Sequence, residues 1–162
     1  MIFRPPSTCH LPVLHVKQHD TGECLVACAT MVCTYVGIPV SYQRLLKVLR
    51  IQRGLGTPFY QIRNLTALNI NVTYREQGTL QELHELLCHG WPCMVGVRTQ
   101  ELPYWDGVDV QHAFVVTGMD PQAIYLNDPE FPDSPIRVSL GDFDLAWLEQ
   151  KEVYAVLAPA SK

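Results

Sequence analysis

The segment from Cys24 to Val36 constrains the fold most, because it carries almost no strongly polar side chain. Its sequence is CLVACATMVCTYV, and Gly37, which follows it, is a residue type that commonly ends helices. A helix that is apolar nearly all round has no face to turn to water, so other parts of the chain must cover it. We therefore predict a central, buried helix over 24–36.

The remaining segments place helices early in the chain and strands late. N-cap residues and apolar spacing predict further helices over 41–50, 57–68, 79–89 and 140–149. Apolar or alternating runs predict strands over 69–76, 92–98, 112–119, 123–128, 135–139 and 152–159. This order predicts an α+β fold with two lobes, in which an N-terminal helical lobe packs on a C-terminal antiparallel β-sheet. We expect one domain over 1–162, with an extended N-terminal arm over 1–16.

Charge and hydropathy narrow the classes of partner. The net charge is −4 and the basic residues are scattered, which argues against a nucleic-acid-binding surface. No run approaches the roughly 18 apolar residues of a membrane helix, and the N-terminus lacks the apolar core of a signal peptide. We therefore expect a cytoplasmic protein with neither a nucleic-acid nor a membrane partner.

The chain has six cysteines, and in a cytoplasmic protein we expect them to be reduced. They form no CxxC pair, so their spacing does not indicate a zinc ribbon, and we expect no metal and no other cofactor. Cys28, one helical turn after Cys24, is the one residue placed to join Cys24 as a metal ligand or disulfide partner. The simpler interpretation of Cys28 and Cys33 is that they fill the core.

Cys24 differs from the other cysteines because it begins the central helix. The segment Thr21-Gly22-Glu23 precedes it as a turn, which places the thiol at the helix N-terminus. Unpaired backbone N–H groups and the helix dipole favour negative charge there, and so favour a thiolate. This position makes Cys24 a candidate nucleophile.

His112 and Asp128 could serve such a nucleophile as base and orienter. His112 begins a predicted strand, and Asp128 ends the next one, where Pro129 restricts the backbone of Asp128 to extended conformations. Two strands paired as a hairpin can bring these side chains together, so that the carboxylate orients the imidazole and stabilises its charged form. Asn127 is the alternative orienter, since an amide can hold an imidazole in the same way.

Gln18, six residues before Cys24, is a candidate donor for an oxyanion hole. Its side-chain amide could fold back over the thiol and act together with the backbone N–H of Cys24. Without the other three residues, Gln18 would be interpreted as an ordinary polar loop residue.

These residues together resemble the papain-like cysteine peptidases, and most closely the double-glycine leader peptidases that process bacteriocins. That family forms N-terminal domains of exporting ABC transporters and also occurs as stand-alone domains. The resemblance is carried by the segments QHDTGECLVACATMV, QHAFVVTGMDPQAIYLNDPEF and VSLGDFDLAW, and it spans about residues 15–158.

The resemblance implies a papain-like two-lobed fold and a role for each candidate. Cys24 would be the nucleophile, His112 the general base, Asp128 the orienter and Gln18 the oxyanion donor. The main departure from the family is Leu25, which stands where a glycine usually follows the nucleophile, and a milder one is Glu23, where the family often has Asp. The Leu25 side chain could contact the substrate and alter the specificity.

The segment 98–111, RTQELPYWDGVDVQ, leads directly into His112 and is a candidate wall of the substrate site. Connections longer than about 12 residues often form lids or binding surfaces. We therefore predict substrate contacts for Tyr104, Trp105 and Gln111. The alternative is a surface hairpin whose aromatic side chains pack on the sheet.

Three functions fit these residues. The first is a cysteine peptidase that cleaves a peptide or isopeptide bond by thiol acyl transfer, with a peptide or protein substrate that could carry a glycine-rich cleavage site. The second is a catalytically inactive binding module on a peptidase fold. The third is a deamidase, transglutaminase or ligase, because these enzymes share the acyl-enzyme and differ in the acceptor.

Overall fold

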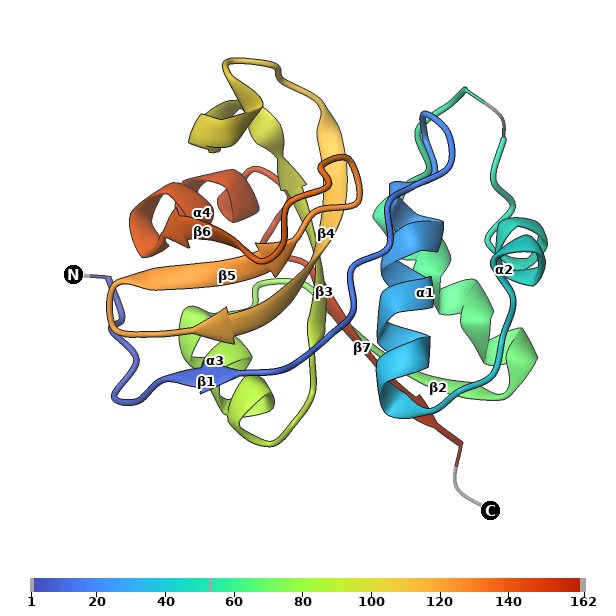
Figure 1. The fold of residues 1–162 in the computed structure, drawn as a ribbon, viewed down its shortest axis with the longest axis horizontal. Helices are drawn as coiled ribbons and strands as arrows, with labels where there is room; N and C mark the ends of the chain where they lie inside the picture. Colours follow the sequence, from blue (N-terminus) through green and yellow to red (C-terminus); the bar gives the residue numbers. More distant parts are fainter. Residues whose placement is uncertain (1, 53, 161–162) are drawn as a thin grey trace.

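The central helix lies where the sequence predicts it. The computed structural model describes residues 2–52 and 54–160, and in it α1 spans Cys24–Val36 with eight buried residues. Gly37 ends the helix in the left-handed conformation (φ 81°), with its backbone N–H directed to the carbonyls of Cys33 and Thr34. Figure 1 shows α1 between the sheet and the other helical elements, so it is covered on both sides.

Two further elements complete the helical lobe, α2 (Tyr42–Val48) and η1 (Phe59–Leu68). Ser41 caps α2 by accepting a hydrogen bond from the backbone N–H of Arg44. The segment η1 is a 3₁₀-helix, which differs from the helix predicted over 57–68 in type. Its inward-facing side chains recur every third residue, and this spacing suits three residues per turn.

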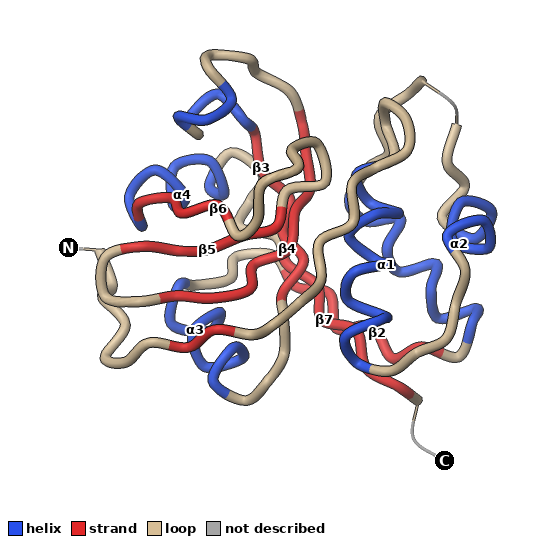
Figure 2. Tube along the Cα trace, in the orientation of Figure 1, coloured by secondary structure: helices blue, strands red, loops and turns tan. Residues whose placement is uncertain are grey.

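The sheet has the strand order β2-β7-β3-β4-β5-β6, and every neighbouring pair is antiparallel. Figure 2 shows these strands running from the second lobe to beneath the helical lobe. The strands are β2 (Ile70–Arg75), β3 (Cys93–Arg98), β4 (Gln111–Met119), β5 (Ala123–Asn127), β6 (Ile136–Ser139) and β7 (Tyr154–Pro159). The predicted α+β class, with a helical lobe on an antiparallel sheet, is confirmed.

Each face of the sheet supports its own hydrophobic core. Along β4, Val115 faces α1, whereas Phe114 faces α3 (Leu80–Cys88) and α4 (Leu140–Leu148). The alternation follows from the two-residue period of a strand. Buried apolar contacts therefore pack the helical lobe on one face of the sheet and α3 and α4 on the other. The edge between these packed regions remains available for a cleft.

The N-terminal arm first pairs with the sheet and then crosses to the helical lobe. Strand β1 (Cys9–His10) pairs with the end of β4, and the backbone N–H of Leu11 continues the contact to Thr117. From there the arm runs between the lobes to α1 (Figure 1).

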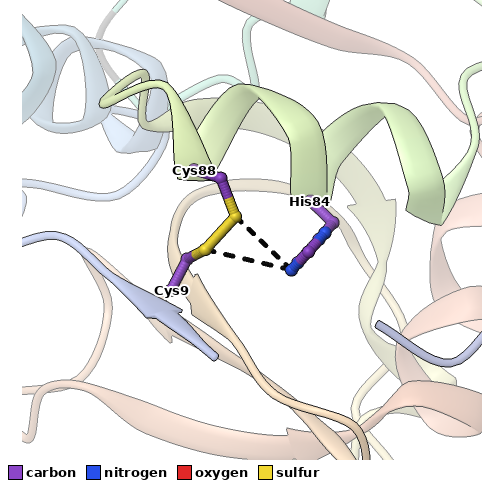
Figure 3. Close-up of side chains that lie close together, drawn as sticks. All are labelled: Cys9, His84 and Cys88. Atoms are coloured by element: carbon purple, nitrogen blue, oxygen red, sulfur yellow. Dashed lines mark hydrogen bonds between the residues drawn. A yellow bond between two sulfur atoms is a disulfide. The ribbon is translucent and has the colours of Figure 1, made fainter. Parts of the chain in front are cut away.

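The arm is also bonded covalently, which corrects the expectation that all six cysteines are reduced. Cys9 in β1 forms a disulfide with Cys88 at the end of α3 (Figure 3). The free thiols are Cys24, Cys28, Cys33 and Cys93. The two bonded cysteines are 79 residues apart, and their pairing depends on β1 docking beside α3, which no spacing rule predicts.

Within residues 2–52 and 54–160, no helix combines the length and apolar character needed to cross a bilayer.

Because the disulfide closes a long loop, we predict that its loss lowers the free energy of unfolding. The expected decrease is about 2–4 kcal/mol for Cys88→Ser or for the reduced wild type. Urea denaturation with and without a thiol reductant measures it. The reductant should leave Cys88→Ser unchanged, and a wild type that is insensitive to reductant would contradict the prediction.

Candidate active site

A cleft of about 400 Å³ opens between the two lobes. From the helical lobe it is lined by Gln18, Thr21, Gly22, Cys24 and the segment 56–59. From the other side it is lined by Gly96, Trp105, Glu130, Gln150 and the segment 110–113. The structure therefore brings His112 to the same cavity as Gln18 and Cys24, which lie far from it in sequence.

The turn before Cys24 is held in place by close packing. Gly22 has a φ of +87°, and a Cβ added there would lie 2.2 Å from the carbonyl oxygen of Leu55, so only glycine fits. Glu23, the buried N-cap residue, accepts a 2.8 Å hydrogen bond from the hydroxyl of Tyr42. The Tyr42 ring in turn stacks on His19 at 3.8 Å between centroids. These contacts set the position of the first turn of α1 and of the partly exposed thiol on it.

His112 and Asp128 form a buried pair beside this thiol. Nε2 of His112 lies 2.7 Å from Oδ1 of Asp128, and the Asp128 side chain is fully buried. Burial alone lowers the pKa of His112, but hydrogen bonds to Asp128 and Cys24 and the charges of these groups raise it to about 10. With Nε2 bound to Asp128, the second ring nitrogen remains for the thiol.

The carboxylate of Asp128 is held on both oxygens. The Tyr104 hydroxyl and the indole N–H of Trp105 donate to Oδ2 at 2.6 and 3.1 Å, and the backbone N–H of Glu130 donates to Oδ1 at 2.9 Å. Burial acts to raise the pKa of Asp128, yet the hydrogen bond and charge of His112, with the bonds from Tyr104 and Glu130, hold it below its ordinary value.

The N-terminal arm contacts the backbone around Asp128. The imidazole Nε2 of His15 lies 2.8 Å from the carbonyl oxygen of Asp128, and the backbone N–H of Gln18 donates to Pro129 at 2.9 Å. The amide Nε2 of Gln18 donates to the carbonyl of Asp20 at 3.1 Å. These contacts hold Gln18 at the cleft, near the N-terminus of α1.

The aromatic residues differ from their predicted role. Trp105 lines the cleft, where its ring meets that of His112 edge to face at 4.8 Å, but its N–H is used by Asp128. Tyr104 is not among the residues that line the cleft and is packed against Phe131. The structure therefore gives Tyr104 a contact with Asp128 in place of the predicted substrate contact. Of the predicted wall, Gln111 lines the cleft and is exposed.

Two other predictions are corrected by burial and bonding. Leu25 is fully buried in the core around α1, so its side chain has no access to a substrate in the cleft. Asn127 donates its amide to the carbonyl of Val13 at 2.9 Å, so it fastens the arm and does not orient His112.

Cys28 is a buried thiol, and nothing in its surroundings favours its ionisation. Burial, followed by the negative charges of Cys24 and Asp128, raises the pKa of Cys28 well above its ordinary value. It forms no disulfide. This environment agrees with the interpretation of Cys28 as a core residue.

Several contacts of the site were not anticipated from sequence, namely those of His15, Tyr42, Tyr104 and Trp105. Each bridges segments that are between 19 and 113 residues apart, and no local spacing relates such segments. The available signal was the aromatic pair Tyr104–Trp105 in the segment that leads to His112, because a buried carboxylate needs donors of this kind.

Comparisons with known proteins identify a family and similar folds. The family model described as the Peptidase C39-like family matches residues 10–155. A C39-like peptidase from Bacillus anthracis has a TM-score of 0.77 and 17% identity, with 96% of this chain and 99% of that chain covered. No curated protein matches the chain.

Two transporter peptidase domains are also similar in structure. The peptidase domain of Streptococcus ComA, a bi-functional ABC transporter, has a TM-score of 0.70 and 22% identity over 90% of this chain and 97% of that chain. A double-glycine-motif protease from an AMS/PCAT transporter, in complex with the leader peptide, has a TM-score of 0.70 and 16% identity. The match covers 98% of this chain and 99% of that chain. These likenesses show the fold.

The pair of His112 with Asp128 predicts that the reaction of Cys24 with an alkylating reagent depends on His112. Iodoacetamide should modify Cys24 at about pH 6, and His112→Ala should slow the reaction at that pH by at least tenfold. Peptide mass mapping identifies the modified residue. Burial raises the pKa of the other free thiols, those of Cys28, Cys33 and Cys93, and so disfavours their reactive thiolate form.

His89→Ala is the matched control, because His89 is an exposed histidine at the end of α3. It should leave the rate unchanged. Equal rates in the wild type and His112→Ala would show that His112 does not activate the thiol.

Proposed function

The chain belongs to the Peptidase C39-like family, and we propose that it is a cysteine peptidase acting through Cys24, His112 and Asp128. One observation carries the proposal. A fully buried carboxylate holds an imidazole of raised pKa beside a thiol at a helix N-terminus, on the wall of a cleft. A structural ion pair would need no thiol and no cleft.

The proposed reaction uses the proton on His112. The Cys24 thiolate attacks the carbonyl carbon of the scissile bond, and the imidazolium gives its proton to the departing amine. Neutral His112 then takes a proton from water, which attacks the thioester and releases the acid together with the Cys24 thiolate. Asp128 keeps the imidazole in one orientation through both steps and stays ionised.

Gln18 is proposed as the side-chain donor to the oxyanion. One N–H of its amide is used by the Asp20 carbonyl, which restrains the group, and the second is the one we assign to the oxyanion. The backbone N–H of Cys24 is the other donor, because the first N–H groups of a helix have no intrahelical acceptor.

The proposed substrate is a peptide or protein, with a glycine-rich segment at the cleavage site. One similar structure is a double-glycine-motif protease with its leader peptide bound. Leu25, which stands where the family usually has glycine, takes no room from the cleft because it is fully buried. Glycine specificity is therefore compatible with this departure. We also propose a cytoplasmic location, in which the Cys9–Cys88 disulfide would be open to reduction.

Incubation with glycine-ended peptide substrates tests the proposal. Cys24→Ala should abolish cleavage while the far-ultraviolet circular dichroism and the melting temperature stay close to those of the wild type. Cys93→Ser is a control that keeps Cys24 and removes another free thiol. Cleavage that persists in Cys24→Ala would overturn the assignment. An uncleaved substrate that binds tightly, with an unreactive Cys24, would favour the binding module.

Tyr104 should act on the rate of the reaction and not on substrate binding. Tyr104→Phe removes the 2.6 Å hydrogen bond to Asp128, and we expect kcat to fall about tenfold, equivalent to ~1.4 kcal/mol, with KM unchanged. Tyr125→Phe is the matched control, because the Tyr125 hydroxyl also donates a 2.6 Å hydrogen bond to a carboxylate, that of Asp120, and neither residue lines the cleft. A raised KM with unchanged kcat would instead indicate that Tyr104 contacts the substrate.

A further inference from the structure

We propose that Cys9, His84 and Cys88 form a redox-gated metal site that binds Zn²⁺ when the disulfide is reduced. The three residues come from β1 and α3 and lie outside the catalytic cleft. The inference is independent of the proposed peptidase activity.

The ligand atoms already have most of the geometry of a zinc site. Nε2 of His84 lies 3.5 Å from Sγ of Cys88 and 3.9 Å from Sγ of Cys9 (Figure 3). In a tetrahedral site with Zn–S of ~2.3 Å and Zn–N of ~2.0 Å, a nitrogen and a sulfur ligand are separated by roughly 3.5 Å and two sulfur ligands by roughly 3.8 Å. The two observed nitrogen–sulfur distances equal the first value or exceed it by about 0.4 Å, so it is mainly the bonded sulfur atoms that have to separate.

That separation is within reach of the side chains. The Cα atoms of Cys9 and Cys88 are 5.5 Å apart, so rotation of each thiol about its Cα–Cβ bond can move the sulfur atoms to roughly 3.8 Å. Cys88 is exposed and Cys9 is half-buried, so a reductant can reach the bond and a water molecule can occupy a fourth metal position.

His84 is placed as a ligand. Its side chain is buried, and Nε2 lies 2.9 Å from the carbonyl oxygen of Ser7 and 3.4 Å from the Ser7 hydroxyl. Metal binding through Nε2 requires the proton to move to Nδ1 and the contact with the Ser7 carbonyl to open. Ser7 is an exposed residue of the arm, so this contact can be replaced by water.

The proposed step balances with a dithiol as the reductant. The disulfide accepts two electrons and two protons, and the dithiol becomes a disulfide. Zn²⁺ then replaces the two thiol protons, which are released to solvent, and the neutral imidazole adds as the third ligand. Two thiolates and one imidazole form a set of ligands that suits zinc well.

Both the disulfide and the reduced site with bound Zn²⁺ would attach the N-terminal arm to α3. The same arm continues to His15 and Gln18, which contact Asp128 and Pro129 at the cleft. Only the reduced, metal-free form would lack a covalent or metal-mediated link between β1 and α3. The site would therefore preserve the anchoring of the arm under reducing conditions.

Titration with Co²⁺ tests the site. The protein carries Cys24→Ser, so that the thiol in the cleft cannot bind the metal, and is reduced under nitrogen. A phosphine converts the disulfide and one water into two thiols and a phosphine oxide. We expect one Co²⁺ per chain, with sulfur-to-cobalt charge-transfer absorption and the visible bands of a tetrahedral site, and its displacement by Zn²⁺. The oxidised protein should show neither absorption.

Variants in the same background assign the ligands. His84→Gln should weaken Co²⁺ binding by at least about tenfold, and Cys88→Ser should abolish the thiolate spectrum. His89→Gln is the matched control, because His89 follows Cys88 but bonds to the carbonyl of Glu85. Equal binding by His84→Gln and His89→Gln would overturn the proposal, as would a reduced protein without the tetrahedral spectrum.

A second measurement covers the case in which His84→Gln does not fold. Zn²⁺ should raise the melting temperature of the reduced protein with Cys24→Ser and leave that of the oxidised protein unchanged, because only the reduced state offers ligands. A reduced protein that Zn²⁺ does not stabilise would contradict the site.

Discussion

The ionised carboxylate of Asp128 is the constraint around which the site is arranged. A fully buried charge is tolerated only when it is paired and hydrogen-bonded. Here one oxygen contacts His112 and the backbone N–H of Glu130, and the other accepts from Tyr104 and Trp105. These partners come from β4, the segment after β5 and η3 (Pro103–Trp105), so satisfying one carboxylate fixes three segments.

The two lobes are coupled through the same region. His15 and Gln18 contact the backbone of Asp128 and Pro129, and a few residues later the chain enters α1 at Cys24. The thiol is therefore positioned by the helical lobe and the imidazole by the sheet, and the arm between them is fastened to both. This arrangement lets a cleft remain open between two well-packed cores.

The fold and the central residues could be predicted because their signals are local. The apolar run from Cys24 to Val36 and the short apolar runs after residue 90 each specify an element with few alternatives. Cys24, His112 and Asp128 are predicted from their places at the ends of such elements, and Gln18 from its spacing of six residues before Cys24. The contacts of Tyr104, the burial of Leu25 and the disulfide of Cys9 depend on tertiary packing between distant segments, and no local period encodes it.

The most direct test of the account is the nitrogen and proton NMR titration of the His112 imidazole in the oxidised wild type. The account predicts an imidazolium at neutral pH that loses its proton at about pH 10, with the signal assigned by its absence in His112→Ala. Asp128→Asn should lower that pKa, since burial of the imidazole then acts with less opposition. A neutral imidazole at pH 7 in the wild type would contradict the central claim that Asp128 holds His112 charged beside Cys24.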